Sequence, residues 1–319
     1  MSISKILLPL DGSRLAESIV PAVGSLARQL YASVQLVSVA DPIATELPAF
    51  IQPEHLRRVA EEANKDVAND DLLAERMKLA ETYLESAAEK LRVAGVSQPI
   101  MTRVFSGEAP DQIVAAVKES RADLVAMGTH GRSGLRRGLL GSVADRVLRA
   151  SSVPVLLVHP HELVVEHPDL SRVESVVVGL DGSQLAESAL ELAAEIAGAY
   201  EAELVLLRAT ATKAAHTVAY VEESFLAGHD YEQGLDHLAL RYLDRKAEPF
   251  VAEGLRVRTQ VDSRVALDAI QSAATEFPNA LIVLASRGRS GLSRWVLGSV
   301  VDAAVRTVER PILVVPPTS

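Results

Sequence analysis

The stretch Leu10–Ser18, which reads L-D-G-S-R-L-A-E-S, decides the fold because it occurs twice: residues 180–188 read L-D-G-S-Q-L-A-E-S. Eight of these nine positions are identical at an offset of 170. Further along, G-R-S-G-L-R-R-G-L-L-G-S-V at 131–143 matches G-R-S-G-L-S-R-W-V-L-G-S-V at 288–300 in ten of thirteen positions. Repeats of this extent indicate a duplicated domain. We therefore predict two domains, 1–159 and 170–319, joined by a linker at about 160–169.

Short apolar runs alternate with helical patterns in both copies. Several runs, such as Leu281–Leu284, are continuously apolar, which is typical of parallel strands covered on both faces. Apolar residues from Leu73 to Leu91 recur at spacings of three and four, which predicts a helix with one buried face. The pattern favours an α/β fold of two repeated doubly wound domains, each a five-stranded parallel sheet with helices on both faces. The predicted strands are 5–10, 34–39, 100–105, 124–127, 155–158, 176–180, 203–209, 257–261, 281–284 and 312–315.

The composition limits the function classes. The chain has 319 residues, of which 48% are hydrophobic and 23% charged, with a net charge of −10. An acidic chain is a poor binder of duplex nucleic acid, which is held by basic side chains. The sequence has no cysteine, which excludes thiolate metal sites, cysteine nucleophiles and disulfides. Neither a signal-peptide core nor a membrane-length apolar run is present, so we expect a cytoplasmic protein that does not associate with membranes.

A glycine-rich loop at 128–142 suggests a phosphate site. Glycines allow backbone N–H groups to approach an anion, and the helix predicted to follow offers free N–H groups at its start. In an open α/β sheet ligands bind beyond the carboxyl ends of the strands, where Asp11 and Asp181 also lie. The loop and its counterpart carry arginines and no acid, and these arginines are Arg132, Arg136 and Arg137 in the first copy and Arg287, Arg289 and Arg294 in the second.

The spacing of this loop resembles that of a known family. Gly128-x2-Gly131-x9-Gly141-Ser142 is similar to the ATP-binding pattern G-x2-G-x9-G-[S/T] of universal stress proteins, and the chain resembles their tandem members over both copies. The resemblance implies the strand order 3-2-1-4-5 and ATP, with Mg²⁺, as the cofactor. It also implies that the two domains pair through their fifth strands, within one chain or in a homodimer. The protein partners are left unidentified.

The resemblance also implies roles for individual residues. Asp11 matches the acid that recognises the adenine amino group, Val39 a backbone contact to adenine, and Met127 a residue of the base pocket. The ribose, the phosphates and the helix start are matched by Gly128, Gly131, Arg132, Gly141, Ser142 and Val143. The counterparts in the second copy are Asp181, Ala209, Leu284, Gly288, Arg289, Gly298, Ser299 and Val300.

One position departs from the pattern, because Ala285 replaces the first glycine in the second copy. Its methyl group takes space beside the ribose and phosphate, and alanine would be strained if the position needs a positive φ. We therefore expect the second site to bind more weakly than the first.

Each assignment has an alternative. Asp11 could simply cap the first helix, and Ser142 and Ser299 could be ordinary helix-start residues. The histidines at 159, 161 and 167 lie in a proline-containing linker and are interpreted as solvated rather than as metal ligands. Asp145 and Asp302 are interpreted as surface or interface acids rather than general bases. No residue is assigned a catalytic or metal-binding role.

The motifs of dedicated phosphotransferases, zinc proteases and serine hydrolases do not occur. The leading hypothesis is an ATP-binding stress or regulatory protein in which nucleotide occupancy modulates domain packing and partner interactions. One alternative is a slow ATPase or autophosphorylating protein with Ser142 or Ser299 as acceptor, and another is a nucleotide-free interaction scaffold. The first copy also has an insertion at 41–70, with a helical stretch at Glu54–Lys65, which is placed to act as a lid.

Overall fold

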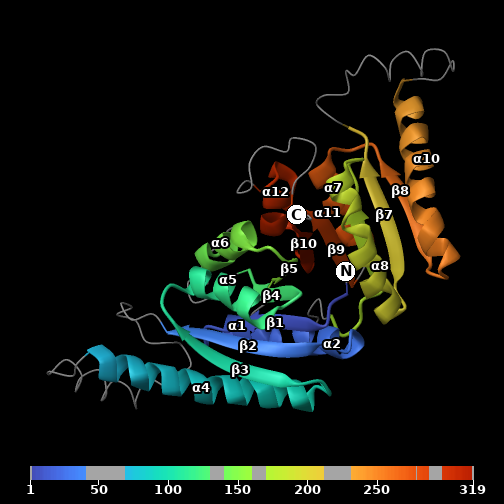
Figure 1. Cartoon of the computed structure of the whole chain (residues 1–319). Coiled ribbons are helices and arrows are strands. Elements are labelled where there is room, and N and C mark those ends of the chain that lie inside the picture. Colours follow the sequence, from blue (N-terminus) through green and yellow to red (C-terminus); the bar gives the residue numbers. More distant parts are fainter. Residues whose placement is uncertain are drawn as a thin grey trace. The chain divides into compact units, whose positions relative to one another are not determined.

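The computed structural model describes residues 2–40, 69–129, 140–159, 170–211, 231–277, 279–286 and 297–317. These residues form two compact units, Ser2–Ser171 and Arg172–Ser319 (Figure 1). Within each unit, parallel strands form a sheet with helices on its faces. The predicted α/β fold is therefore confirmed. The proposed lid, apart from its last two residues, lies outside the described part of the chain.

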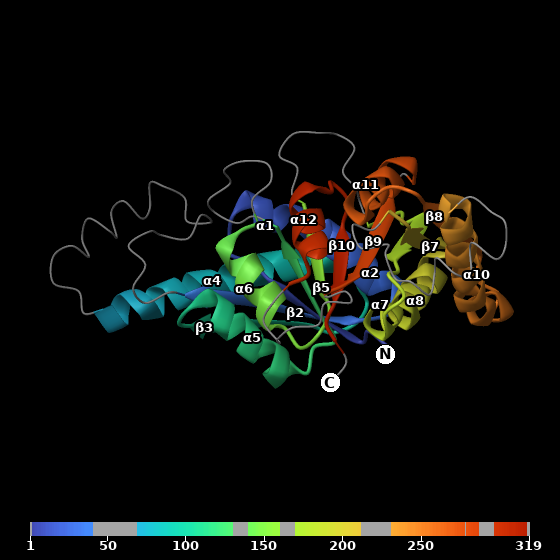
Figure 2. The same ribbon diagram turned by 90° about the horizontal axis from the view of Figure 1, so that it is seen from above.

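The first unit has the sheet order β3-β2-β1-β4-β5, with every pair of neighbours parallel. Helices α4 and α5 lie on opposite faces of this sheet (Figure 1). Helices α5 and α6 pack against each other (Figure 2). The strands are β1 Lys5–Pro9, β2 Ser33–Ala40, β3 Ile100–Ser106, β4 Leu124–Gly128 and β5 Val155–Val158, and the helices are α1 Arg14–Ser18, α2 Val20–Gln29, α4 Asn69–Val93, α5 Ala109–Ser120 and α6 Ser142–Ala150.

The second unit repeats this arrangement, with the order β8-β7-β6-β9-β10 and parallel neighbours throughout. Counted within the unit, this is again the order 3-2-1-4-5. The strands are β6 Ser175–Gly179, β7 Glu203–Ala209, β8 Val257–Asp262, β9 Ala280–Ala285 and β10 Ile312–Val315, and the helices are α7 Gln184–Glu187, α8 Leu190–Tyr200, α10 Tyr231–Ala252, α11 Ala266–Glu276 and α12 Ser299–Thr307.

Burial follows the sequence pattern. All six residues of β9 are buried, as expected for a strand covered on both faces. In α4 the predicted apolar face is buried from Ala80 onward, since Ala80, Leu84, Ala87 and Leu91 are each no more than 3% exposed, whereas Leu73 and Met77 are half-buried. Each sheet thus has an apolar core. Within the described residues, no helix combines the length and the apolarity that crossing a membrane requires.

Candidate functional site

The strand register brings the predicted adenine-site residues of the first unit to one edge of the sheet. Pro9 pairs with Val37, so Asp11 and Val39, each two residues further on, lie at the same level. On the other side of β1, Leu7 pairs with Val125, which places Asp11 level with the end of β4. This is the carboxyl edge at the point where the strand order reverses, where ligands of open α/β sheets bind.

Asp11 sits in a tight turn between β1 and α1. Gly12 has φ +80°, which glycine adopts without strain, and Asp11 Oδ1 accepts the Ser13 N–H at 2.9 Å. The helix cap is Ser13, whose Oγ accepts the Ala16 N–H at 3.0 Å. Asp11 therefore supports the turn, and the capping role considered for it belongs to Ser13.

The second unit has the same turn. Gly182 has φ +85°, Asp181 Oδ1 accepts the Ser183 N–H at 2.9 Å, and Ser183 caps α7 by accepting the Ala186 N–H at 3.1 Å. The Ser183 hydroxyl also donates to Asp181 Oδ1 at 2.6 Å. Asp181 and Ala209 lie level at the carboxyl edge, because Gly179 pairs with Leu207.

The start of α6 is tied to the end of β4. The Gly141 N–H donates to the Thr129 carbonyl at 2.8 Å, and the Thr129 N–H donates to Val158 of β5 at 3.0 Å. Gly141 is the N-cap and makes no side-chain cap bond, while Ser142 is exposed at the first helical position. Ser142 is thus a helix-start residue by position, but its hydroxyl does not cap the helix.

The start of α12 repeats this geometry. The Gly298 N–H donates to the Ser286 carbonyl at 2.8 Å, and Gly298 is an N-cap without a side-chain cap bond. Ser299 is exposed. In both units the helix thus starts just beyond the carboxyl end of a strand, at a glycine N-cap that makes no side-chain cap bond.

The acids one turn into these helices are held by arginines. Arg149 forms two hydrogen bonds with Asp145, both at 2.9 Å, and Arg306 forms two with Asp302, both at 3.1 Å. Such bidentate pairs fix the carboxylates on the helix surface. This arrangement fits the interpretation of both acids as surface groups.

A tyrosine from the long helix borders each turn, a feature that sequence reasoning missed. Burial raises the pKa of Tyr83 well above its ordinary value, and the negative charges of Glu17 and Asp11 add to the shift. The Gly12 backbone acts in the opposite direction and lowers the pKa of Tyr83, but by less than burial raises it. Its counterpart is Tyr242, at the offset of 159 that also relates Gly95 to Gly254.

Burial also raises the pKa of Tyr242, and its hydrogen bond to Glu187 at 2.9 Å favours the protonated form. Lys246 donates to the same carboxylate at 2.8 Å. In the first unit the corresponding Glu17 accepts from Lys90 at 2.9 Å. At this offset Lys90 is equivalent to position 249, and Lys246 is equivalent to position 87. The two units therefore form the same ion pair with a lysine that stands on a different turn of the long helix.

The base-pocket candidates differ in shape between the units. Met127 and Leu284 are 6% and 4% exposed. A Cβ on Gly179 would lie only 2.7 Å from Leu284 Cδ2, so the leucine occupies the space above that glycine. In the first unit the corresponding strand residue is Pro9, level with Met127. At this position the first unit therefore has the larger residue on its first strand, Pro9, whereas the second unit has glycine there and fills the space with Leu284 of its fourth strand.

The strain argument for Ala285 does not apply. Ala285 is the last residue of β9 and pairs with Val315, and neither it nor Gly128 has a positive φ. Only the volume of the methyl group separates the two positions. Val143 and Val300 lie in the first turns of α6 and α12, beside the residues already described.

Several candidates fall outside the described residues and stay predictions: Gly131, Arg132, Gly288 and Arg289, together with His161 and His167. Among the residues that are described, no group of three or more histidine, aspartate or glutamate side chains is placed to hold a metal ion. The site that can be described is thus the turn, the strand ends and the helix start.

Comparison with known proteins adds a family. The model of the universal stress protein family matches residues 2–159 and 173–316. A universal stress protein of Mycobacterium tuberculosis is 30% identical over 213 residues, a match that spans 66% of this chain and 66% of the relative. One from Mycolicibacterium smegmatis is 26% identical over 325 residues, covering 98% of this chain and 97% of the relative.

A solved structure shows the same fold. The crystal structure of a universal stress protein from Archaeoglobus fulgidus superposes with a TM-score of 0.66 at 23% identity, covering 98% of both chains. Together with the family match in each half, these relatives explain the duplicated turn, sheet and helix start. The chain is a tandem member of the universal stress protein family, with one family domain in each half.

Proposed function

We propose that the first unit binds ATP, with Mg²⁺, across the carboxyl edge of its sheet. The observation that carries this proposal is the placement of Asp11, Val39 and Met127–Gly128 at one edge, beside a helix start whose cap is a glycine. The family match supports it further, because some members of the family bind ATP.

The chemistry of the edge suits the parts of the nucleotide. A carboxylate accepts several hydrogen bonds, so Asp11 can hold both the Ser13 N–H and the adenine amino group. Met127 offers an apolar contact for the base. The N–H groups at the start of α6 and the helix dipole favour the phosphates, and glycine at the cap leaves room for them.

We propose ATP binding without a hydrolytic step. Asp145, the acid in the first turn of α6, is engaged by Arg149 and is not offered as a general base. We propose that occupancy acts by changing how the protein interacts with partners. The pairing of the two halves through their fifth strands stays a prediction.

A thermal melt of the full chain with MgATP tests binding. Binding to the folded state alone stabilises it by about 2.7 kcal/mol at a ligand concentration one hundred times the dissociation constant. We expect Gly141→Val to reduce the shift to what the weaker second site supplies, because its side chain crowds the phosphates of the first site. Gly141 has φ −60°, which valine adopts without backbone strain, so the ligand-free melt serves as the folding control. A melt of the natural sequence unmoved by millimolar MgATP contradicts the proposal.

A further inference from the structure

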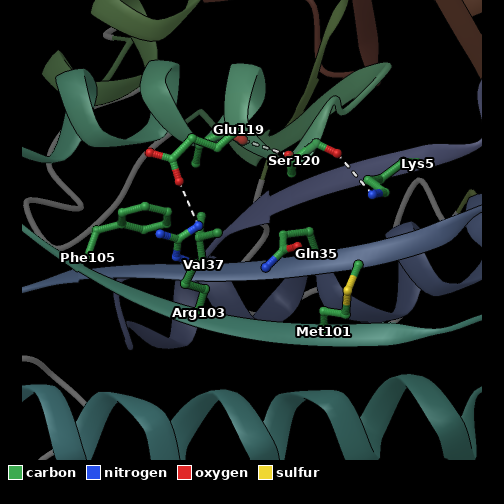
Figure 3. Close-up of a pocket in the computed structure, with 9 residues that line it drawn as sticks. Lys5, Gln35, Val37, Met101, Arg103, Phe105, Glu119 and Ser120 are labelled. Atoms are coloured by element: carbon green, nitrogen blue, oxygen red, sulfur yellow. Dashed lines mark hydrogen bonds and ion pairs between the residues drawn. The ribbon is translucent and has the colours of Figure 1, made fainter.

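A cavity lies in the first unit on the side of the sheet that α5 covers, and it extends from the start of β1 to Phe105, which pairs with Val39 of β2. It has a volume of about 250 Å³ and opens between α5 and strands β1–β3 (Figure 3). It reaches Lys5, the first residue of β1, whereas Asp11 follows the last. We call this cavity the α5 groove. The residues that carry the argument are Lys5, Gln35, Met101, Arg103, Phe105 and Ser120.

Gln35 is the unusual residue of the groove. It lies in the interior of β2 and is only 8% exposed, and Figure 3 shows its amide directed into the space below α5. No side chain or backbone group among the described residues hydrogen-bonds this amide, which is open to the groove and not sealed in the core. A ligand in the groove would supply the missing partner.

The second unit shows that the fold does not require this amide. Gln35 corresponds to Val205, which is fully buried, and Ser120 corresponds to Phe277, which is 6% exposed. The guanidinium of Arg258 lies 5.3 Å from the centre of the Phe277 ring. Two buried apolar side chains therefore stand in the second unit where the first unit has the polar Gln35 and Ser120.

The charges of the groove favour an anion. Lys5 Nζ donates to the Ser120 carbonyl at 2.9 Å, and an ammonium group has three donors. Arg103 pairs with Glu119 at 2.6 Å and lies 4.6 Å from the centre of the Phe105 ring. Two cations thus face one carboxylate, in a chain whose net charge is −10.

We propose that the α5 groove binds a small monocarboxylic acid with an apolar body. Lys5 and Gln35 would hold the carboxylate, and Phe105 and Met101 would contact the apolar part. The volume is below the range of about 300–1,000 Å³ of pockets for larger ligands, so a nucleotide does not fit. The groove shares no residue with the proposed ATP site, although its Phe105 pairs with Val39.

Benzoate is a suitable probe, with benzamide and benzylamine as neutral and cationic compounds of the same size. We expect titration of the full ¹⁵N-labelled chain with benzoate to shift the side-chain amide of Gln35 and the backbone amide of Ser120. The amides of Val205 and Phe277 should not move. Absence of benzoate shifts, or binding of benzylamine as tight as that of benzoate, overturns the proposal.

Two variants connect the shifts to the groove. Gln35→Val installs the residue of the second unit and should weaken benzoate at least tenfold, because the carboxylate loses a donor, while the melting temperature stays equal or rises, because valine suits a buried strand position. Lys5→Met should weaken benzoate about tenfold, whereas Lys118→Met, an exposed lysine outside the groove, makes the same charge change without effect. Unchanged affinity for benzoate in Gln35→Val and Lys5→Met overturns the proposal.

The MgATP-induced melting shift should persist in Gln35→Val. The proposed carboxylate site and the proposed ATP site are therefore tested separately.

Discussion

Asp11 and Asp181 illustrate how one residue type does two jobs at the residue scale. Each carboxylate accepts the N–H two residues later and so holds the turn that starts a helix. The same carboxylate faces the edge where we propose that adenine binds. Substituting either aspartate should therefore change both stability and nucleotide binding. Comparing the same substitution in the two halves separates the two effects.

We expect Asp11→Ala to weaken ATP about tenfold and to reduce the preference for ATP over GTP, because the adenine amino group loses its acceptor. Asp181→Ala removes the equivalent turn bond from the other half and should leave the tighter site intact. Calorimetric titrations with both nucleotides measure this. Unchanged selectivity in Asp11→Ala contradicts the adenine role.

The raised pKa of Tyr242, which is half-buried, predicts that stability depends on alkaline pH. Because the pKa of Tyr242 is raised above the unfolded value of about 10, its contribution to stability is complete below pH 10 and is lost as the pH rises beyond it. Tyr242→Phe should lower stability by about 1 kcal/mol near neutral pH, through the lost bond to Glu187, and flatten the decline above pH 10. Urea unfolding from pH 7 to 11 tests this, with the exposed Tyr31→Phe as control. An equally steep decline in Tyr242→Phe counts against it.

Helix ends decide stability at the element scale. Helix α8 is followed by its C-cap residue Glu201, which has φ +52°, and Tyr31 occupies the equivalent position after α2 with the same φ. A side chain is disfavoured in this left-handed conformation, where glycine is the usual residue. Both copies therefore have the left-handed conformation at this position, and neither has a glycine there.

Glu201→Gly should therefore stabilise the protein by up to about 1 kcal/mol, or raise the melting temperature by about 2–4 °C. Ala199→Gly, two residues earlier and inside α8, should destabilise it by about 0.5–1 kcal/mol, because glycine loses more freedom in a helix. Calorimetric melting curves of the two variants distinguish these signs. Destabilisation in Glu201→Gly would show that its side chain makes a contact worth more than the strain.

At the scale of the whole molecule, the two halves predict unequal nucleotide sites. The methyl group of Ala285 takes space that Gly128 leaves open, without backbone strain in either case. We expect calorimetric titration of the full chain to show two affinities, with Gly141→Val removing the tighter site and Gly298→Val the weaker one. Two equal sites, or loss of the tighter site in Gly298→Val, reverses the assignment.

The sequence predicts the strands and their order well, because continuous apolar runs and the repeat are local signals. All ten predicted strands lie within a residue or so of the observed ends. The partners of Glu17 and Glu187 could not be predicted, since they depend on how a helix more than fifty residues away is rotated. For the same reason Gln35 reads in the sequence only as a polar interruption of a strand, until α5 is placed above it.

The ion pairs of Glu17 and Glu187 bear on the history of the duplication. Two identical copies cannot have begun with the lysine on different turns, so each of the two helix positions has changed in at least one half. If an ancestral copy carried lysine at both positions, either lysine could later be lost without loss of the ion pair, because an amine on either turn reaches the carboxylate. In this way individual residues of the two copies can be substituted while the ion pair between the first helix and the long helix is retained.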